Sequence, residues 1–523
     1  METPLTPMDF ARRARRLYPE FEAVVDGDSR FTYSQFLERC DRWSKALQDM
    51  GIVAGDRVAV IAPNTHSNLE NYYAIPQIGA VIVPVNYRLT ADEFAYILLH
   101  SGAKMVCVHG DYLDDIDSIR SQCPDLEHFV ALEGEKKGWI DYETRLAESD
   151  LQFDAPEIAE SDLLSINYTS GTTSRPKGVM ITHRNVYMNV VGTLIHQHLT
   201  PADNYLWTLP MFHANGWTFP WTITACGGTH VCLRKVEPAE IFRLMQVEKI
   251  SMFCAAPTVL IGIANAPEEL RKTAPRGVRL ITAGAPPAAA TIERIENELG
   301  WDLTQAYGLT ETAPFITICE PRVDHQKLDS SERANIKARQ GVELITSGDL
   351  RVVDEDDVEV PWDGKTLGEI TVRGNVVMQG YYNDKKATKE AMRGGYFHSG
   401  DAAVVHPDGY VEIRDRFKDV IISGGENISS VEVEGVLLRH PAVQEAAVVG
   451  MPHEEWGESP HAFVICKQDS DVTEDELKQF VRDNMAHFKT PKWVSFVDEL
   501  PKTATGKIQK FALREGGAGI HKQ

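Results

Sequence analysis

The strongest constraint on the fold is a regular alternation of helical and strand patterns between residues 31 and 130. Segments with apolar residues at helical spacing, such as SQFLERCDRWSKALQDMG, end near glycine, and short β-branched runs such as DRVAVIAPN, VIVPVNYR and KMVCVHG follow them. This alternation is typical of a doubly wound, largely parallel α/β structure. The same rhythm returns over residues 200–310. We therefore expect doubly wound α/β layers to form most of a large N-terminal domain.

The pattern changes after residue 340 and again near residue 417. Strand-like runs such as GDLRVVDEDD, GEITVRG and GYVEIRDR, separated by Asp-Gly turns, predict an antiparallel β-rich subdomain. A small α/β unit follows, in which SSVE (429–432) and TEDE (473–476) have the spacing of helix-capping boxes. A chain of 523 residues is too long for one core. We expect an N-terminal domain over residues 1–416 and a small α+β C-terminal domain over residues 417–523.

The net charge of −23 argues against nucleic acid or an anionic membrane surface as a partner. The eight cysteines are scattered without a CxxC pair, so we expect reduced thiols rather than a zinc site or a disulfide framework. No run of about 18 apolar residues and no apolar signal segment occurs in the sequence. We therefore expect a cytoplasmic protein without an integral membrane segment, and a homodimer stays open.

The segment YTSGTTSRPKG (168–178) has the composition of a phosphate-binding loop. It holds two glycines, a cluster of Ser and Thr hydroxyls and one Lys, after the strand-like run LLSINYT and before a helical pattern. Backbone N–H groups and hydroxyls of such a loop can bind phosphate oxygens, with Lys177 adding positive charge. The segment is not a Walker A loop, which requires GxxxxGK[ST]. Seen alone, it could equally be a solvated surface loop.

Six further segments carry candidate functional groups. They are LPMFHANGW (209–217), TAGAPP (282–287), QAYGLTET (305–312), FHSGD (397–401), RDRFKDVIISGGEN (414–427) and PKTATGKIQK (501–510). Each of them taken alone has a plain structural explanation; His213, for example, is more often a hydrogen-bonded structural histidine than a ligand-binding one. Their joint occurrence in this order favours a nucleotide-dependent enzyme.

Together, the seven segments resemble the adenylate-forming superfamily, which includes acyl-CoA synthetases, peptide-synthetase adenylation domains and luciferases. The resemblance extends from RFTYSQF at residue 30 to GKIQK at residue 506 and is strongest to medium-chain, long-chain and aryl acid–CoA ligases. It implies ATP, Mg²⁺ and coenzyme A as cofactors and co-substrates. It also implies a mobile C-terminal domain, hereafter the lid, that carries a catalytic lysine.

The resemblance assigns roles to individual residues, which stay expectations here. Binding of the β- and γ-phosphates falls to Thr169, Ser170, Gly171, Thr172, Thr173 and Lys177, and binding of the α-phosphate to Thr310. Gly284, Ala285 and Pro286 are assigned to the adenine pocket, Tyr307 to stacking on adenine, and Ala306 and Gly308 to nucleotide binding. The ribose is assigned to Asp401 and Arg416, the acyl pocket to His213, Gly216 and Trp217, the pantetheine tunnel to Gly424 and Gly425, and the hinge to Lys418. The candidate catalytic residues are Lys507, Glu311, Thr310 and His213, with Glu311 as the Mg²⁺ ligand.

Three positions depart from the usual pattern of the superfamily. Ser174 and Asp415 replace glycines, and Tyr396 replaces a frequent tryptophan. The extra side chains could stiffen the phosphate loop and alter the turn before the ribose arginine. None of the three changes removes a chemical group that the reaction requires.

The expected reaction is ATP-dependent ligation of a carboxylic acid to coenzyme A through an acyl-AMP intermediate. The apolar TFPWT segment behind HANGW favours a medium-chain, branched, thioether or aryl acid over acetate. The main alternative is an adenylation enzyme that loads a separate carrier protein. A luciferase-like oxygenase acting on an acyl adenylate is a weaker alternative, which oxygen uptake would reveal. A non-enzymatic nucleotide-binding scaffold is disfavoured, because Glu311 and Lys507 are both present.

Overall fold

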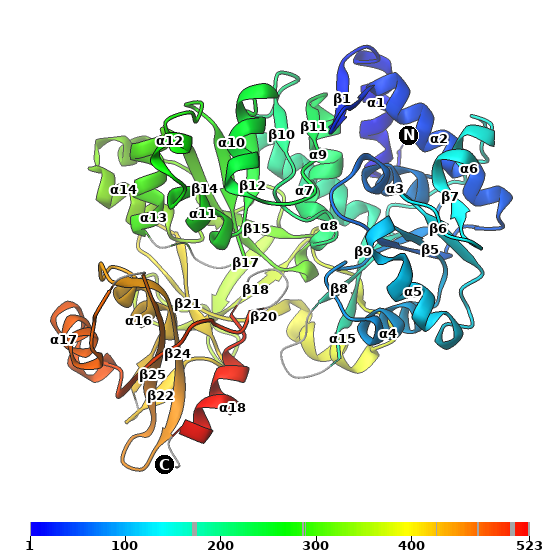
Figure 1. The fold of residues 1–523 in the computed structure, drawn as a ribbon. Helices are drawn as coiled ribbons and strands as arrows, with labels where there is room; N and C mark the ends of the chain where they lie inside the picture. The colour runs from blue at the N-terminus through cyan, green and yellow to red at the C-terminus, as the bar shows by residue number, and fades with distance from the viewer. Residues whose placement is uncertain are drawn as a thin grey trace.

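The computed structural model describes residues 2–169, 175–284, 287, 289–424, 426–467, 470–502 and 508–520. Figure 1 shows a large N-terminal part, blue to yellow, with the smaller C-terminal domain, orange to red, beside it. This confirms the expected fold class of mixed α/β layers, a β-rich subdomain and a small C-terminal domain. The boundary between residues 416 and 417 stays a prediction.

The first α/β layer is an eight-stranded sheet in the order β19-β9-β8-β4-β3-β5-β6-β7. Its strands β3 to β8 pair in parallel, as expected from the buried β-branched runs. At one end of the sheet β9 pairs antiparallel with β8, and the edge strand β19 pairs antiparallel with β9. The bounds are β3 Arg57–Ile61, β4 Val81–Pro84, β5 Ala103–Val108, β6 His128–Ala131, β7 Ile140–Asp141, β8 Leu163–Thr169, β9 Lys177–Thr182 and β19 Gly380–Tyr381.

The second α/β layer is a nine-stranded sheet in the order β16-β15-β14-β13-β12-β10-β11-β1-β2. Its centre is parallel, and both edges are antiparallel. The bounds are β1 Glu22–Asp26, β2 Ser29–Thr32, β10 Asn204–Leu206, β11 Thr229–Val231, β12 Met252–Ala255, β13 Arg279–Thr282, β14 Asp302–Gly308, β15 Phe315–Ile318 and β16 Val342–Glu343.

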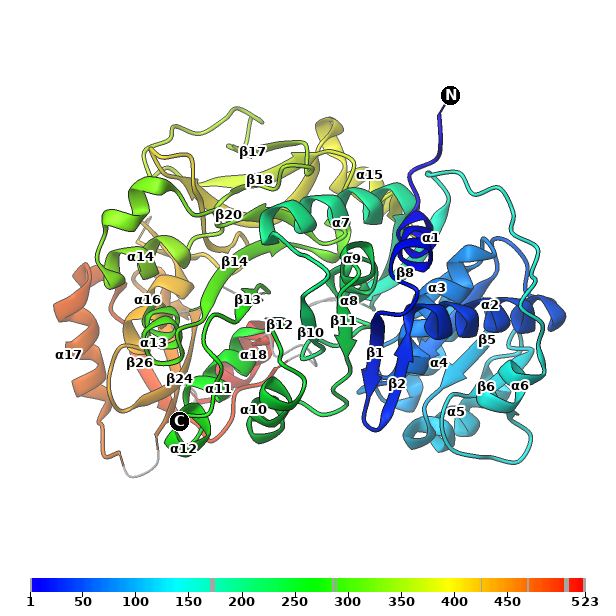
Figure 2. The same cartoon turned by 90° about the horizontal axis from the view of Figure 1, so that it is seen from above.

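Fifteen helices accompany these sheets in the described part of the N-terminal region. In Figure 2 the helices lie around and between the two sheets. Their bounds are α1 Met8–Leu17, α2 Tyr33–Asp49, α3 His66–Gln77, α4 Ala91–Ser101, α5 Leu113–Ile119, α6 Tyr142–Glu148, α7 His183–Gln197, α8 Ala214–Trp217, α9 Phe219–Cys226, α10 Pro238–Val247, α11 Pro257–Ala264, α12 Glu268–Arg271, α13 Ala289–Arg294, α14 Ser330–Lys337 and α15 Lys385–Ala391.

The β-rich subdomain is a four-stranded antiparallel sheet, as expected from the strand-and-turn pattern after residue 340. It comprises β17 Asp349–Val353, β18 Gly368–Arg373, β20 Phe397–Val405 and β21 Val411–Arg416. Strand β21 is the last strand before the C-terminal domain, so this sheet is the surface from which the lid departs.

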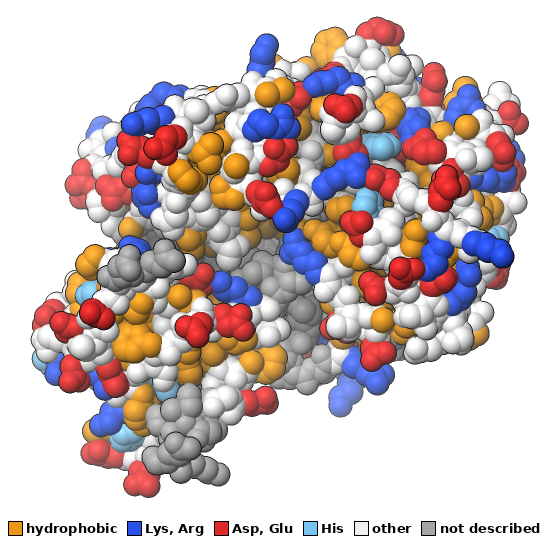
Figure 3. Space-filling view, viewed as in Figure 1, with side chains coloured by type: hydrophobic (Ala, Val, Ile, Leu, Met, Phe, Trp, Pro, Cys, Tyr) orange, Lys and Arg blue, Asp and Glu red, His pale blue; other side chains and the backbone are white. Residues whose placement is uncertain are grey.

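The C-terminal domain has its own sheet and its own core. The sheet contains β22 Ile421–Ser423, β23 Glu426–Ile428, β24 Val443–His453, β25 Gly457–Cys466 and β26 Trp493–Phe496, and the helices are α16 Ser430–Leu437, α17 Glu474–Asn484 and α18 Lys510–Ile520. Apolar residues of these elements pack with one another rather than with the N-terminal core. A separate core allows the domain to move as a unit. The space-filling view is hollowed between it and the larger part (Figure 3).

Helix caps follow the sequence pattern closely. Thr473 and Glu476 form the predicted capping box at α17, and the Ser429 hydroxyl caps α16 by accepting from the Glu432 backbone N–H at 3.1 Å. Of the described helices, none is long and apolar enough to cross a membrane.

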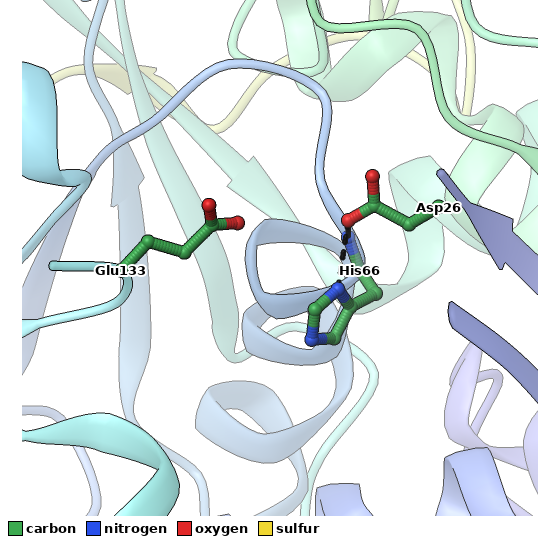
Figure 4. A group of neighbouring side chains, drawn as sticks. All are labelled: Asp26, His66 and Glu133. Atoms are coloured by element: carbon green, nitrogen blue, oxygen red, sulfur yellow. Dashed lines mark hydrogen bonds and ion pairs between the residues drawn. The ribbon is translucent and has the colours of Figure 1, made fainter. Parts of the chain in front are cut away.

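An ion-pair network joins the two large sheets around Asp26, His66 and Glu133 (Figure 4). Asp26 ends β1, His66 begins α3, and Glu133 follows β6. Their ligand atoms lie within 4.8 Å of one another, and His66 Nδ1 lies 2.7 Å from Asp26 Oδ2. The Arg234 guanidinium binds Asp26 at 3.1 Å and Glu133 at 2.6 Å. Because Arg234 already supplies the balancing positive charge, we assign this cluster a structural role rather than a metal-binding one.

Candidate active site

The two ends of the predicted phosphate loop meet in an antiparallel strand pair. Thr169 at the end of β8 lies opposite Lys177 at the start of β9. The helix predicted after the loop is present as α7, which starts at His183. Strand β9, which was not predicted, lies between the loop and this helix, because KGVMIT is rich in β-branched residues and pairs with β8. Ser170, Gly171, Thr172, Thr173 and Ser174 lie outside the described residues, so their phosphate contacts stay predictions.

Tyr381 connects two of the predicted site residues. Its hydroxyl donates to Glu311 Oε1 over 2.9 Å, and the Lys177 ammonium lies 4.7 Å from the centre of its ring. Strand β19 positions it by pairing Tyr381 with Val179 of β9. Burial, followed by the charge of Glu311, raises the pKa of Tyr381, so the phenol stays a hydrogen-bond donor at neutral pH. The structure thus brings Lys177 and Glu311 to the same place.

Sequence reasoning missed Tyr381. The tyrosine sits in the run QGYYND, which matches no site motif, and an aromatic residue in such a run is most often a packing residue. Its pairing partner β9 is about 200 positions earlier in the chain, so only the folded sheet places Tyr381 beside Glu311.

Tyr307, Asp401 and Arg416 form a second cluster. The Tyr307 hydroxyl donates to Asp401 Oδ2 at 2.6 Å, and Arg416 Nε lies 2.7 Å from Asp401 Oδ1. Asp401 and Arg416 face each other in the register of β20 and β21. Although burial opposes it, the negative charge of Asp401 raises the pKa of Arg416. Tyr307 lies near the end of β14 and Glu311 on the 3₁₀ turn that follows, so the two clusters are neighbours.

The segment between these clusters is tightly constrained. Ala306 and Tyr307 are buried at the end of β14, and a Cβ on Gly308 would lie 1.8 Å from the Pro314 carbonyl oxygen. Glycine is therefore required at position 308. Thr310 and Glu311 follow on a short 3₁₀ turn, Thr310–Thr312, which is fixed by a hydrogen bond from Met378 N to Glu311 O at 2.8 Å. Gly284 has a φ of 95°, consistent with the turn predicted there, while Ala285 and Pro286 lie outside the described residues.

The predicted acyl-pocket residues lie on one unusual turn. His213 is partly exposed just before α8, Gly216 is buried against the Trp207 ring, and Trp217 is 4% exposed. The Trp217 ring packs edge-on against Phe315 of β15, with centroids 5.5 Å apart. The role of these residues in an acyl pocket stays a prediction.

The lid contributes fewer described site residues. Lys507 and Gly425 lie outside the described residues, and their roles stay predictions. Gly424 has a φ of 59°, and its N–H donates to the Trp456 carbonyl oxygen at 2.9 Å. Lys418 is exposed in the turn between β21 and β22, where the sequence placed the hinge.

Two of the three departures now have a physical account. The buried carboxylate of Asp415 accepts hydrogen bonds from Ser430 of the lid. Tyr396 donates to Asp349, and the Arg351 and Arg373 guanidinium carbons lie 5.3 and 4.9 Å from the centre of its ring. The change at position 396 is therefore a packing change at the surface, as expected. Ser174 is outside the described residues.

Comparison with known proteins agrees with this geometry. The AMP-binding enzyme family matches residues 10–382, and the AMP-binding enzyme C-terminal domain matches residues 432–507. Trans-cinnamate:CoA ligase, peroxisomal, of Petunia hybrida is 38% identical over 98% of this chain and 94% of its own length. 4-Hydroxybutyrate–CoA ligase 2 of Metallosphaera sedula is 40% identical over 98% of this chain and 94% of its own length.

Solved structures give the same result. An anthranilate CoA ligase in complex with anthranoyl-AMP superposes with a TM-score of 0.89 at 26% identity, covering 99% of each chain. The family match, the two relatives and this structure each span most or nearly all of the present chain. The chain therefore belongs to the AMP-binding enzyme family and, within the adenylate-forming superfamily, to the acyl-CoA synthetases, which are AMP-forming acid–thiol ligases.

Proposed function

We propose that this enzyme ligates a carboxylic acid to coenzyme A in two ATP-dependent steps. The first joins the carboxylate to the α-phosphate of ATP and releases pyrophosphate, and the second transfers the acyl group from AMP to the thiol of coenzyme A. The observation that carries the proposal is the convergence of Lys177, Tyr381 and Glu311 beside Tyr307, Asp401 and Arg416.

The charges of this site suit the first step. A carboxylate approaching ATP meets strong electrostatic repulsion, so cations must lie where negative charge develops. Lys177 sits at the base of the phosphate loop, and in this proposal Lys507 of the lid adds a second cation. In the same proposal Thr310, next to Glu311, hydrogen-bonds the α-phosphate.

Glu311 fits the role of a Mg²⁺ ligand. Its carboxylate is partly exposed, and the Tyr381 hydroxyl holds one oxygen in place. Carboxylate oxygen is the ligand type that Mg²⁺ prefers. When bound, the ion would neutralise phosphate charge.

The nucleoside end is proposed to bind at the second cluster. Tyr307 offers a ring for adenine, and Asp401 and Arg416 offer groups for the ribose. The Asp401 carboxylate is 4% exposed and already binds Tyr307 and Arg416. A ribose would therefore share Asp401 with these two partners.

For the acyl group we propose a medium-chain, branched, thioether or aryl acid. The buried Trp217–Phe315 pair supports an apolar or flat substrate. Two of the similar proteins are named as ligases of aromatic acids, cinnamate and anthranilate, which lie within this range. The third is named for 4-hydroxybutyrate, a short linear acid outside it.

The deciding experiment measures pyrophosphate and AMP release with ATP, Mg²⁺ and a panel of linear, branched, thioether and aromatic acids. Each acid is tested with coenzyme A and without it. We expect pyrophosphate without a thiol in a single turnover, and multiple turnovers only with coenzyme A. Turnover that requires a carrier protein in place of coenzyme A would support the carrier-loading alternative. No turnover with any acid would contradict the proposal.

Location and assembly belong to the same proposal. We place the enzyme in the cytoplasm, whereas the Petunia relative carries the word peroxisomal in its name. Fractionation of cells that express the tagged full chain distinguishes the two compartments. The sequence leaves open whether the enzyme is a homodimer. Light scattering, which measures the molar mass in solution, tests this.

A further inference from the structure

The turn that carries the acyl-pocket residues has a rare backbone conformation. Five successive residues, Ala214 to Thr218, have positive φ values of 45°, 55°, 55°, 53° and 66°. Positive φ is uncommon for residues other than glycine and costs on the order of 1 kcal/mol for each. Only Gly216 among the five escapes this cost. Such a turn persists only where the surrounding structure holds it firmly, and strain of this kind gathers at functional sites.

A closed ring of side-chain hydrogen bonds holds the turn at Asn215. Asn167 Nδ2 donates to Asn215 Oδ1 at 3.0 Å, Asn215 Nδ2 donates to Ser165 Oγ at 2.8 Å, and Ser165 Oγ donates to Asn167 Oδ1 at 2.8 Å. The three side chains are at most 2% exposed. Buried amides that are satisfied in this way lock their backbone in place, because breaking one bond leaves a polar group unpaired.

The far end of the turn is held by a second set of contacts. Thr218 Oγ1 lies 3.4 Å from Asn189 Oδ1, and Asn189 Nδ2 donates to the Phe315 carbonyl oxygen at 2.9 Å. Phe315 in turn packs against the Trp217 ring. A Cβ on Gly216 would lie 2.7 Å from the Trp207 ring, so the middle of the turn is also confined.

The ring attaches the turn to the strand that leads into the phosphate loop. Ser165 and Asn167 are alternate residues of β8, which ends at Thr169. Backbone ladders to β4 and β9 hold β8 itself. The turn, by contrast, lies outside the sheets. Its backbone bonds are local, such as Thr222 N to Thr218 O at 3.0 Å, and side-chain bonds of Asn215 join it to β8.

We propose that the Ser165–Asn167–Asn215 ring is a positioning device that sets which acids the enzyme accepts. The side chains of the ring are bonded to one another, so the ring acts by holding His213 and Trp217 in a fixed position relative to strand β8. The inference rests on the proposed ligase function and adds three residues, outside the predicted site, to the determinants of acid selectivity.

The test compares Asn215→Gly with the wild-type enzyme. Glycine keeps the left-handed backbone accessible and removes only the ring. We expect the KM for the preferred acid to rise about tenfold, and the ratio of kcat/KM between a bulky and a small acid to shift at least tenfold. The KM for ATP should change less than about threefold, since β8 keeps its ladders. Ser165→Ala removes one corner of the ring and should change the same ratio in the same direction by less.

Asn71→Ala is the matched control. Asn71 is also buried, accepting from Trp43 Nε1 at 2.9 Å and donating to the Ser67 carbonyl oxygen at 2.7 Å. It should lower the melting temperature as Asn215→Gly does, but leave the acid ratio at the wild-type value.

Hydrogen exchange gives a readout that does not depend on activity. We expect the amides of residues 214–218 to exchange faster in Asn215→Gly and in Ser165→Ala, and at the wild-type rate in Asn71→Ala. An unchanged acid ratio or unchanged exchange in both ring variants would overturn the positioning role. A wild-type enzyme that ligates no acid would instead defeat the proposed function, and the exchange experiment would still report whether the ring holds the turn.

Discussion

The carboxylate of Asp415, on the last strand of the N-terminal part, accepts a hydrogen bond from the backbone N–H of Ser430, the first residue of lid helix α16, at 2.8 Å. It also accepts from the Ser430 hydroxyl, which in turn binds the Lys510 ammonium of α18. Lys510 Nζ lies 2.8 Å from the Glu434 carboxylate. Asp415 is therefore both a helix cap and a link between the two domains, directly beside the proposed hinge at Lys418.

Asp415→Ala should weaken this link. The change leaves the Ser430 N–H without its carboxylate partner, which costs about 1–3 kcal/mol. We expect a lower free energy of unfolding and faster proteolytic cleavage in the segment that joins the domains. Asp384→Ala is the control, because Asp384 caps α15 by a 2.8 Å bond within the N-terminal part. The control should lose stability without faster cleavage at the hinge. Equal cleavage of Asp415→Ala and wild type would show that the link does not hold the lid.

Tyr381→Phe should weaken Mg²⁺ use. The substitution removes the hydroxyl that holds Glu311 Oε1 but keeps the ring under Lys177. A hydrogen bond to a charged group contributes about 1.5–3 kcal/mol, so we expect the Mg²⁺ concentration for half-maximal pyrophosphate release to rise roughly tenfold. Tyr382→Phe, at the neighbouring position, serves as the control. If the Mg²⁺ dependence of both variants matches wild type, Tyr381 does not position Glu311.

Alkaline pH should weaken the Asp26–His66 ion pair, which Figure 4 shows. Burial lowers the pKa of His66, but hydrogen bonds with Asp26 and Glu143 and the charge of Glu70 outweigh it and raise the pKa to about 9. The folded pKa lies above the ordinary value of 6.5, so protonated His66 stabilises the fold fully below pH 6.5, and this contribution is lost as pH rises through 9. Its size is on the order of 2–3 kcal/mol.

The measurement is urea unfolding of wild type and His66→Gln between pH 6 and pH 10. The difference in free energy of unfolding should be large at pH 6 and small at pH 10. Arg234 does not titrate in this range, so its bonds to Asp26 and Glu133 provide a constant background. A difference that does not depend on pH would show that His66 is neutral in the folded enzyme.

Most of the α/β architecture followed from the sequence because local patterns determine it. Buried parallel strands need nearly continuous apolar runs, and β3, β4 and β5 have them. Strand β9 was missed because KGVMIT directly follows the loop and is short, and because its partners β8 and β19 are set by the folded sheet. The capping box of α17 was predicted correctly because it depends on residues four positions apart at most.

The site was less accessible to sequence reasoning, since its geometry depends on tertiary contacts. Alternating polar residues such as Ser165 and Asn167 normally indicate the solvent face of a strand, yet both are buried by bonding Asn215 about 50 positions later. Nor does any local preference predict positive φ at Trp217 and Thr218. Asp415 was expected to disturb a turn, whereas it caps a helix of the other domain.

The two-step mechanism itself predicts that a lid residue and a hinge residue fail in different half-reactions. Lys507 is proposed to enter the active site only while acyl-AMP forms. Lys507→Ala should therefore slow acyl-AMP formation by about 10²–10³-fold, the effect of losing one transition-state cation. Transfer from chemically supplied acyl-AMP to coenzyme A should stay close to wild type, because the lid then presents another face.

Lys418, in the turn between β21 and β22, is proposed as the pivot. Lys418→Pro fixes φ near −65° and removes a backbone N–H, so it should hold the lid in one pose. If that pose is the adenylating one, the variant should release pyrophosphate in a single turnover but form little acyl-CoA. Phe417→Pro cannot serve as the control, because it would also remove the hydrogen bond from the Phe417 N–H to the Gly400 carbonyl oxygen at 3.1 Å. Lys418→Ala, which keeps backbone freedom, should turn over normally. Equal damage to both half-reactions by Lys507→Ala, or normal turnover of Lys418→Pro, would contradict a rotating lid.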